Sequence, residues 1–506
     1  MRTIRAMGRA RLVRPYGADL GNRGLSQGSV PASRDCTLGY FRSSRREEGC
    51  RNSEVVVSTH KDVVCGFCGC LCDDLEVEVE NNRIIQVKSA CGIGRNKLLH
   101  AQSGMATIRI NGQSASLQDA LDEAARILIA AKNPLIYGLS SASTEAQREA
   151  VALTEMLQGT IDNPSSYCHG PSVLAGQQVG VASCTLGEVK NRADLVIFWG
   201  ANPAESHTRH MMRYSVQAKG LFVPEGRKGR KVVVIDVRPT PTAKQADLFL
   251  QCLPGQDFEI ATALRALIKG LPLEAPPPQH AQRRRVPGTP FEESGAIAGV
   301  PVERWREVAA LMKGCRYGVL FFGIGLTQSR GKDLNVEQVL TLVQELNQFT
   351  RFHAIPNRGH GNVTGSNQVL AWQTGYPFAV NFSRGYPRYN PGEYSVVDML
   401  MRRDVDAALI VATDPGAHLP QAAVRHLQSI PTIFLEPYEN TTSSWAKVVI
   451  PVAPMGVGAA GTFYRMDLVS LRLDKLIDFP CPSDEEVLRS IKERIVNAED
   501  RERAGL

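Results

Sequence analysis

Two kinds of apolar pattern follow one another along the chain. Residues 55–58, 74–80 and 83–88 are rich in β-branched residues or alternate between apolar and charged ones, and Asn81-Asn82 is a natural turn. This pattern predicts a small antiparallel sheet. From about residue 115, short apolar runs alternate with segments of helical periodicity, which is typical of α/β domains built on a parallel sheet.

The periodicity predicts the main elements of the α/β region. Helices are expected over 117–131, 144–157, 207–218, 259–268, 336–346 and 420–427. Buried strands are expected over 134–137, 194–199, 231–237, 317–322, 407–411 and 432–435, with 448–452 as a later edge strand and a final helix over 484–496. The proline- and arginine-containing stretch 270–300 has the composition of an exposed linker.

The recurrence of strand, glycine-containing turn and helix suggests a duplicated, Rossmann-like arrangement. We predict two such parts, roughly 115–265 and 315–455. The expected domains are therefore a leading extension over 1–55, a small β-domain around the cysteines over 56–112, an α/β region over 113–490 and a tail over 491–506.

The net charge of +7 is concentrated at the start of the chain. Residues 1–46 contain ten arginines and two acids, a net charge of +8, which leaves −1 for the rest of the chain. No basic stripe remains to bind a nucleic acid backbone. The arginine-rich opening has the composition of a transit peptide, of a disordered tail, or of an upstream extension from a wrongly chosen start codon.

Hydropathy excludes two further classes. There is no run of 18 apolar residues and no short apolar segment near the start. Neither a membrane span nor secretion is indicated, so we expect a cytoplasmic protein.

Five of the twelve cysteines crowd into 27 positions: Cys65, Cys68, Cys70, Cys72 and Cys91. Disulfides do not persist in a reducing cytosol, so crowded thiols indicate a metal. Without Cys70 the spacing is Cys-x2-Cys-x3-Cys-x18-Cys, which suits the four corners of a [4Fe-4S] cluster. A structural zinc site is the alternative, although such sites normally have two Cys-x2–4-Cys pairs, and Cys91 has no neighbouring Cys or His.

A second group of residues has the character of a cofactor site. Cys168-His169-Gly-Pro occurs in a loop after a predicted helix, although a lone cysteine of this kind is more often a small apolar filler. Glycine and polar residues follow the predicted strands: Gly200, Asn202, Asp236, Arg238, Gly255 and Asp257. Together these turns predict a large nucleotide-like cofactor lying across the strand ends.

As a set, the motifs resemble the B subunit of formylmethanofuran dehydrogenase, within the formate dehydrogenase-like molybdopterin oxidoreductases. The resemblance rests on the cysteine loop and on five further strings: Cys-His-Gly-Pro-Ser at 168–172, Leu-Gly-Glu-Val-Lys-Asn-Arg-Ala-Asp at 186–194, Trp-Gly-x-Asn-Pro at 199–203, Arg-Gly-His-x-Asn-Val-x-Gly at 358–365 and Gly-Thr-x-x-Arg-Met-Asp at 461–467. It extends over roughly 60–490, and the order of the motifs matches as well.

The resemblance implies a fold and a set of roles. The fold would be a multi-domain α/β molybdopterin oxidoreductase with a small N-terminal iron-sulfur β-domain. Cys168 would ligate tungsten or molybdenum held by two molybdopterin guanine dinucleotides, and His169 and Arg358 would flank the open face. Cys65, Cys68, Cys72 and Cys91 would hold the [4Fe-4S] cluster that carries electrons. Gly200, Asn202, Asp236, Arg238, Gly255 and Asp257 are the expected contacts to the pterin nucleotides.

The resemblance also implies partners. Larger members of the superfamily continue into a C-terminal β-barrel over the pterins, which we expect this chain to lack, with a D subunit supplying that lid. An amidohydrolase-like A subunit and a C subunit would complete the complex, and carbon dioxide and formate would be interconverted. The main alternative is a redox-silent scaffold within the related bacterial formyltransferase/hydrolase complex, which releases formate hydrolytically; an empty α/β fold with structural zinc is a third possibility.

Overall fold

The computed structural model describes residues 57–273 and 295–504. The predicted extension over 1–55 and most of the predicted linker over 270–300 lie outside the described residues. Within the described ranges, no helix is both long and apolar enough to cross a membrane.

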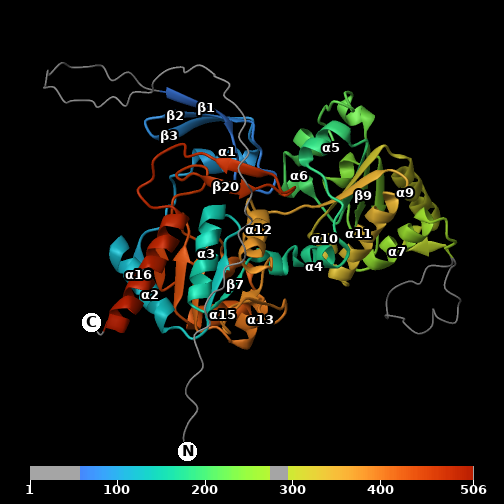
Figure 1. Ribbon diagram of the computed structural model, residues 1–506. Coiled ribbons are helices and arrows are strands. Elements are labelled where there is room, and N and C mark those ends of the chain that lie inside the picture. Colours follow the sequence, from blue (N-terminus) through green and yellow to red (C-terminus); the bar gives the residue numbers. More distant parts are fainter. Residues whose placement is uncertain (1–56, 274–294, 505–506) are drawn as a thin grey trace, which may run out of the picture. The chain divides into compact units, whose positions relative to one another are not determined.

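The small antiparallel sheet forms as the alternation predicts. It consists of β1 (Val57–Val63), β2 (Leu75–Glu80) and β3 (Arg83–Lys88), and Asn81 and Asn82 both take positive φ angles in the turn between β2 and β3. Asparagine tolerates this left-handed conformation better than most residues. Helix α1 (Gly92–Leu99) follows β3, is capped by Cys91 and packs beside the small sheet (Figure 1).

A parallel five-stranded sheet forms the core of one α/β unit. Its order is β10 (Leu248–Gln251), β9 (Lys231–Asp236), β8 (Leu195–Trp199), β13 (Tyr317–Phe322) and β14 (Arg351–Pro356). One face packs against α4 (Gly170–Val179), α7 (Asp257–Ile268), α9 (Val302–Gly314) and α11 (Asp333–Leu346). The other face shares one apolar core with α5 (Leu186–Arg192) and the small antiparallel sheet.

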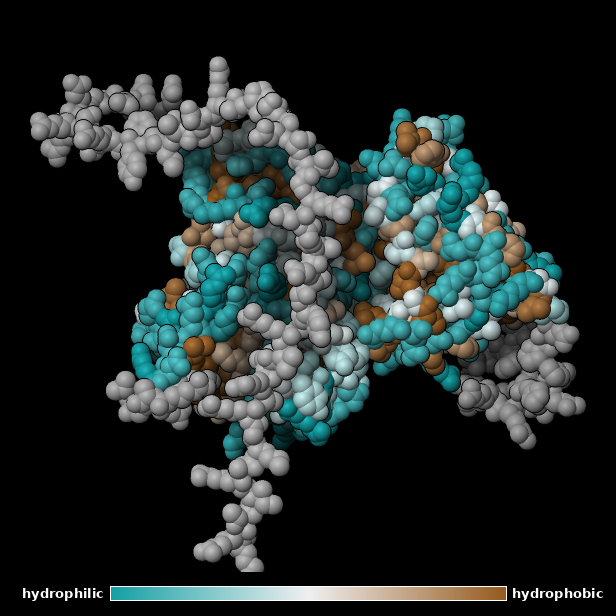
Figure 2. Space-filling view, viewed as in Figure 1, coloured by the Kyte–Doolittle hydropathy of each residue, from teal (hydrophilic) through white to brown (hydrophobic). Residues whose placement is uncertain are grey.

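The second α/β unit is built on a nine-stranded mixed sheet. Its order is β16 (Arg388–Tyr389), β15 (Val380–Asn381), β7 (Thr160–Asp162), β6 (Pro134–Gly138), β17 (Ala407–Val411), β18 (Thr432–Leu435), β19 (Val448–Ile450), β4 (Arg109–Ile110) and β5 (Gln113–Ser114). Helices α2 (Leu117–Ala130), α3 (Thr144–Met156), α12 (Val363–Thr374) and α16 (Asp484–Ala504) cover one face. Helices α13 (Val396–Arg402) and α15 (Gln421–Ser429) cover the other. On the side seen in Figure 2, hydrophilic residues predominate over α3 and α16, whose apolar side chains face the sheet.

The two sheets repeat one topology. The order β10-β9-β8-β13-β14 has its counterpart in β19-β18-β17-β6-β7, and all of these strands are parallel. In the nine-stranded sheet, however, β6 and β7 come before the five-stranded sheet in the chain, and β17, β18 and β19 come after it. The predicted division into 115–265 and 315–455 is therefore wrong at its boundaries, because each predicted part contributes strands to both sheets.

Four further expectations need correction. Residues 207–218 form no α-helix: α6 (Pro203–Ser206) is followed by a π-helical turn, Met211–Ser215, because the buried His207 and His210 and the ion-paired Arg209 and Arg213 are held by tertiary contacts. Strand β19 is internal to its sheet and not an edge strand, because it pairs with β18 on one side and with β4 on the other. The predicted 56–112 domain is not separate from the α/β region, because its strand β4 belongs to the large sheet. The predicted tail begins inside α16, where Ile491 and Ile495 are buried.

Two hairpins complete the described chain. Strands β11 (Ala296–Ile297) and β12 (Val300–Pro301) pair beside α9, and β20 (Gly461–Tyr464) pairs with β21 (Ser470–Leu473). Phe463 and Leu473 of the second hairpin pack in one small apolar cluster with Leu71 of the cysteine loop. This hairpin, which comes late in the sequence, therefore packs against the cysteine loop.

Candidate functional site

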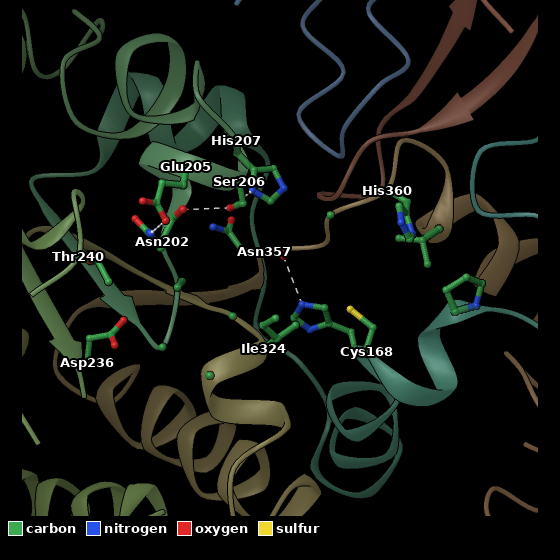
Figure 3. A pocket seen from close by; sticks show the side chains of 18 of the residues that line it. Cys168, Asn202, Glu205, Ser206, His207, Asp236, Thr240, Ile324, Asn357 and His360 are labelled. Atoms are coloured by element: carbon green, nitrogen blue, oxygen red, sulfur yellow. Dashed lines mark hydrogen bonds between the residues drawn. The ribbon is translucent and has the colours of Figure 1, made fainter. Parts of the chain in front are cut away.

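A cavity of about 490 Å³ lies at the carboxyl ends of the strands of the five-stranded sheet (Figure 3). The loops after β8, β9, β13 and β14 form one side of it, and the segment before α4 forms the other. Six of the predicted site residues line it: Cys168, His169, Gly200, Asn202, Asp236 and Arg238. This edge is where ligands bind in open α/β sheets.

Cys168 is positioned through its backbone. The preceding 3₁₀ turn, Pro164–Tyr167, begins at Asn163, whose side chain accepts a hydrogen bond from Ser165 N at 3.0 Å. The Cys168 carbonyl accepts hydrogen bonds from Thr327 Oγ1 and Gln328 Nε2, both at 2.8 Å. Burial raises the pKa of the Cys168 thiol to about 11, and the positive charge of Arg358 partly opposes this shift. A soft metal ion would stabilise the thiolate that burial alone disfavours.

His169 is buried beside Cys168. Its Nε2 lies 3.2 Å from the Asn357 carbonyl, which can only accept, so Nε2 carries a proton; Nδ1 lies 3.2 Å from Ser172 Oγ. Burial, with a further contribution from Arg358, lowers the pKa of His169 to about 3. The imidazole is therefore neutral at physiological pH and is held in one orientation.

Arg358 follows β14, and its guanidinium donates a hydrogen bond to Asn367 Oδ1. Burial lowers the pKa of Arg358 to about 10, and the Cys168 thiol opposes this shift, so the guanidinium stays charged near neutral pH. The side chain is not part of the cavity wall, whereas its neighbours Asn357 and Gly359 are. The Arg358 carbonyl accepts a hydrogen bond from His207 Nε2 at 2.8 Å, which joins this loop to the loop after β8.

The cysteine loop and α1 carry the predicted cluster ligands, and Cys65 lies near enough to the other three for their charges to affect its pKa. Cys65 N donates to Cys72 O at 2.8 Å, and Gly94 N donates to Cys91 Sγ at 3.3 Å. A Cβ on Gly94 would lie 3.3 Å from Cys65 Sγ and 3.6 Å from Cys91 Sγ, so this glycine leaves room between two thiols. Burial raises the pKa of Cys65 to about 12, and Cys68, Cys72 and Cys91 are close enough to contribute to that shift. Among the described residues, no three His, Cys, Asp or Glu side chains form a group that could hold a metal ion.

The cysteine loop packs directly against the Arg358 loop. Gly69 N donates to Gly359 O at 3.0 Å, and a Cβ on Gly69 would lie 2.2 Å from the Arg358 carbonyl oxygen. Likewise, a Cβ on Gly361 would lie 2.0 Å from the Gly66 carbonyl oxygen. No side chain fits at these contacts, so glycine is required for the two loops to meet backbone to backbone.

A second cavity, of about 240 Å³, lies at the matching strand ends of the nine-stranded sheet. Lys97, Asp414, Glu436 and Tyr438 line it, and His360 lines both cavities. Burial raises the pKa of Glu436 to about 8. The sequence interpretation did not identify this second site.

The same hydrogen-bond pattern occurs at both strand ends. Thr242 lies after β9, and its Oγ1 donates to Asn202 Oδ1 after β8 at 2.7 Å and accepts from Ala204 N at 3.1 Å. Thr442 lies after β18, and its Oγ1 donates to Asp414 Oδ1 after β17 at 2.5 Å and accepts from Gly416 N at 2.9 Å. The strings Asn202-Pro203 and Asp414-Pro415 were the available sequence signal for this repeat.

Two predicted nucleotide contacts do not line the cavity. Asp257 is buried and accepts hydrogen bonds from Trp199 Nε1 at 2.9 Å and Ser329 Oγ at 2.7 Å, so its carboxylate already has partners. Gly255 takes a φ of +74° in the turn before α7. Gly200 lines the cavity, but its missing side chain also lets the loop after β13 approach, since a Cβ would lie 2.8 Å from Leu326 N.

Several cavity residues were missed. Glu205, Ser206, His207, Thr240, Ile324 and Asn357 also line the first cavity. His207 is buried, with Nδ1 2.8 Å from Ser206 Oγ. Periodicity placed His207 at the start of a helix, and only the tertiary contact to Arg358 reveals its position.

The sequence is similar to those of known molybdopterin enzymes. The model of the molybdopterin oxidoreductase family matches residues 108–445. The B subunit of the tungsten-containing formylmethanofuran dehydrogenase 2 of Methanocaldococcus jannaschii is 44% identical over 450 residues, which cover 87% of this chain and 99% of that protein. The B subunit of the formyltransferase/hydrolase complex Fhc of Methylorubrum extorquens is 24% identical over 364 residues, which cover 70% of this chain and 87% of that protein.

A solved structure shares the fold. The crystal structure of the formyltransferase/hydrolase complex FhcABCD from Methylorubrum extorquens with methylofuran contains a chain that matches with a TM-score of 0.63 and 22% identity. The match covers 78% of this chain and 99% of that chain. The fold, the family match and the extent of the 44% identity agree: the chain belongs to the molybdopterin oxidoreductases and, within them, to the B subunits of formylmethanofuran dehydrogenase.

Proposed function

We propose that this chain is the catalytic subunit of a cytoplasmic formylmethanofuran dehydrogenase that interconverts carbon dioxide and formate. The observation that carries the proposal is the Cys168 thiol on the wall of the larger cavity, close enough to the charged Arg358 for each to shift the pKa of the other. A thiol beside a fixed cation suits a soft-metal redox centre that handles a carboxylate.

The residues fit a metal held by two pterin nucleotides. Two cavities lie at equivalent strand ends, and the same hydrogen-bond pattern recurs at each. Asn202, Asp236 and Arg238 would bind one nucleotide, and Asp414 and Glu436 the other. Asp257 would support the first site by accepting the hydrogen bond of the Trp199 indole, and Gly255 would shape the turn before α7. Cys168 would ligate the tungsten or molybdenum, which supplies the two-electron chemistry.

We also propose an iron-sulfur cluster at the cysteine loop. Cys65, Cys68, Cys72 and Cys91 would hold a [4Fe-4S] cluster, and Gly94 leaves the space between two of these thiols open. The cluster would accept and pass on single electrons. The backbone contact between Gly69 and Gly359 would fix the cluster loop to the loop that carries Arg358.

The protein's own side chains would attract the substrate and handle the proton. Oxidation of formate to carbon dioxide breaks one C–H bond and releases two electrons and one proton. The buried Arg358 guanidinium, which does not line the cavity, would attract the formate carboxylate through its positive charge. His169, neutral and oriented by its Nε2 hydrogen bond to the Asn357 carbonyl, would hold a proton transiently at Nδ1 beside the Ser172 hydroxyl.

The proposal includes partner subunits. Because the chain is a B subunit, it is part of a multisubunit enzyme. We propose that an amidohydrolase-like A subunit joins formate to its amine carrier, and that C and D subunits complete the assembly, with the D subunit covering the pterins.

A redox-silent scaffold is the second candidate, and the 24% identity and shared fold with the Fhc proteins favour it. The 44% identity to the tungsten-containing enzyme and the presence of Cys168, Arg358 and the complete cysteine set favour the redox enzyme. A scaffold would have no physical need for these side chains.

Formate-dependent reduction of a viologen dye by the purified native complex distinguishes the two candidates. The redox proposal predicts dye reduction with formate, and incorporation of labelled carbon dioxide into formate when reduced dye is supplied. Hydrolytic release of formate from a formylated carrier without any dye reduction would support the scaffold instead.

A further inference from the structure

An amide side chain on the wall of the larger cavity has no hydrogen-bond partner. Asn357 is 7% exposed, and neither its Nδ2 nor its Oδ1 forms a hydrogen bond with any described residue. The other amide on this wall, Asn202, is bound to the protein at both atoms, since Oδ1 accepts from Thr242 Oγ1 at 2.7 Å and Nδ2 donates to Glu205. A buried polar group without a partner costs free energy, which a ligand that supplied the missing partners would recover.

The backbone holds this side chain in one place. Asn357 N donates to the Phe322 carbonyl of β13 at 2.8 Å, and the Asn357 carbonyl accepts from His169 Nε2 at 3.2 Å. Figure 3 shows the Asn357 side chain in the middle of the lining residues, with Asp236 on one side of it and Cys168 on the other. The amide therefore lies between the proposed metal ligand and a proposed nucleotide contact.

The amide favours a ligand that offers both a donor and an acceptor. Nδ2 has two hydrogens to donate, and Oδ1 has two lone pairs to accept hydrogen bonds. Formate offers acceptor oxygens only, so it would satisfy Nδ2 and leave Oδ1 of Asn357 without a partner. A pterin ring carries N–H groups next to a carbonyl oxygen and ring nitrogens, so one edge of the ring satisfies both atoms.

We propose that the Asn357 amide binds the ring edge of the pterin in the larger cavity, an assignment that rests on the proposed function. The contact holds the ring in the part of the cavity between Asp236 and Cys168. It uses the side chain of Asn357 alone, so the backbone carbonyl still accepts the hydrogen bond that orients His169. Asn357 is thus a cofactor-binding residue that the sequence motifs did not mark.

Asn357→Leu tests the contact, because leucine has the same branching as asparagine but no polar side-chain atom. Replacing an unpartnered buried amide by an apolar group of similar shape is close to neutral for the fold, so the complex should assemble. Loss of two hydrogen bonds to the ring should make pterin dissociate roughly tenfold faster. The measurement is the rate at which the purified holoenzyme complex releases pterin, which is assayed as its fluorescent oxidation product.

A matched control removes a buried amide that already has partners. Asn381 on β15 is 4% exposed, its Nδ2 donates to Thr160 Oγ1 at 2.8 Å, and its Oδ1 accepts from Ser383 Oγ at 2.6 Å. Asn381 lines neither of the two cavities. Asn381→Leu should therefore lower the thermal midpoint of the complex and leave the rate of pterin release unchanged.

Two readouts decide whether the amide binds the pterin or the substrate. Faster pterin release from Asn357→Leu, with a KM for formate within about twofold of the wild-type value, supports the proposal. Unchanged release with a KM for formate raised about tenfold would assign the amide to the substrate and overturn the proposal. No change in either quantity would also overturn it. If the Asn357→Leu complex does not assemble, Asn357→Ala, which adds no bulk, decides by the same two measurements.

The wild-type complex separates this inference from the proposed function. A wild-type complex that contains no pterin would refute the proposed function itself. A wild-type complex that contains pterin, with release from Asn357→Leu at the wild-type rate, would leave the proposed function in place and refute only the role of Asn357.

Discussion

Replacing Cys168 by serine is expected to reduce formate oxidation by more than about 100-fold while leaving the fold intact. Loss of a residue that only orients a metal ligand typically costs 10–100-fold in metal affinity or activity, and Cys168 is proposed to be the ligand itself. Serine supplies a harder donor with a much higher pKa than a thiol. The measurements are dye-linked formate oxidation and tungsten or molybdenum content of the Cys168→Ser complex.

The structure explains why the fold should survive this change. The hydrogen bonds that hold Cys168 in place use its backbone N–H and carbonyl groups. Cys315→Ser is the matched control, because that thiol lies at the end of α9 and donates to the Met312 carbonyl at 3.2 Å. We expect normal activity from the control. Full activity and full metal content in Cys168→Ser would contradict the assigned role.

Replacing Gly69 by alanine is expected to disturb the cluster and Arg358 together. The new Cβ would lie 2.2 Å from the Arg358 carbonyl oxygen, and neither backbone can yield without moving its own loop. Overpacking of this kind typically costs about 1–3 kcal/mol, which corresponds to a roughly 5- to 160-fold lower rate if all of the cost falls on the active conformation. We expect a lower thermal midpoint, partial loss of iron and slower formate oxidation.

Gly359→Ala provides the control for this contact. Gly359 is the hydrogen-bond partner of Gly69 in the opposing loop, but a Cβ at position 359 meets no atom within 4 Å. Its variant should therefore keep near-normal iron content and a near-normal thermal midpoint, and activity is not compared because Gly359 lines the first cavity. Equal losses in the two variants would show that the loops are sensitive to any alanine, and that the close approach at Gly69 is not the cause.

The local pattern of the chain predicts most of its elements but not their connection. The strands at 317–322, 407–411 and 432–435 form as expected, because continuous apolar runs of this length suit strands that are buried on both faces of a parallel sheet. The division between the two α/β units could not be predicted. The chain leaves the nine-stranded sheet after β7 and returns to it at β15, and periodicity carries no information about which strands pair.

The candidate site shows the same limit. Cys168, His169, Asn202 and Asp236 could be selected because short motifs and strand ends mark them. His207 and Asn357 could not, since their positions depend on contacts between loops that are far apart in the sequence. Asp257 was selected for its place after a turn, but its carboxylate is committed to Trp199 and Ser329.

The metal and cofactor content of the purified native complex tests the central claim most directly. Mass spectrometry for iron, zinc, tungsten and molybdenum, with assay of released pterin nucleotide, should give about four iron atoms and about one tungsten or molybdenum per chain, with about two guanine nucleotides. A complex that contains neither a group 6 metal nor pterin would contradict redox chemistry at Cys168 and leave the scaffold as the function to pursue.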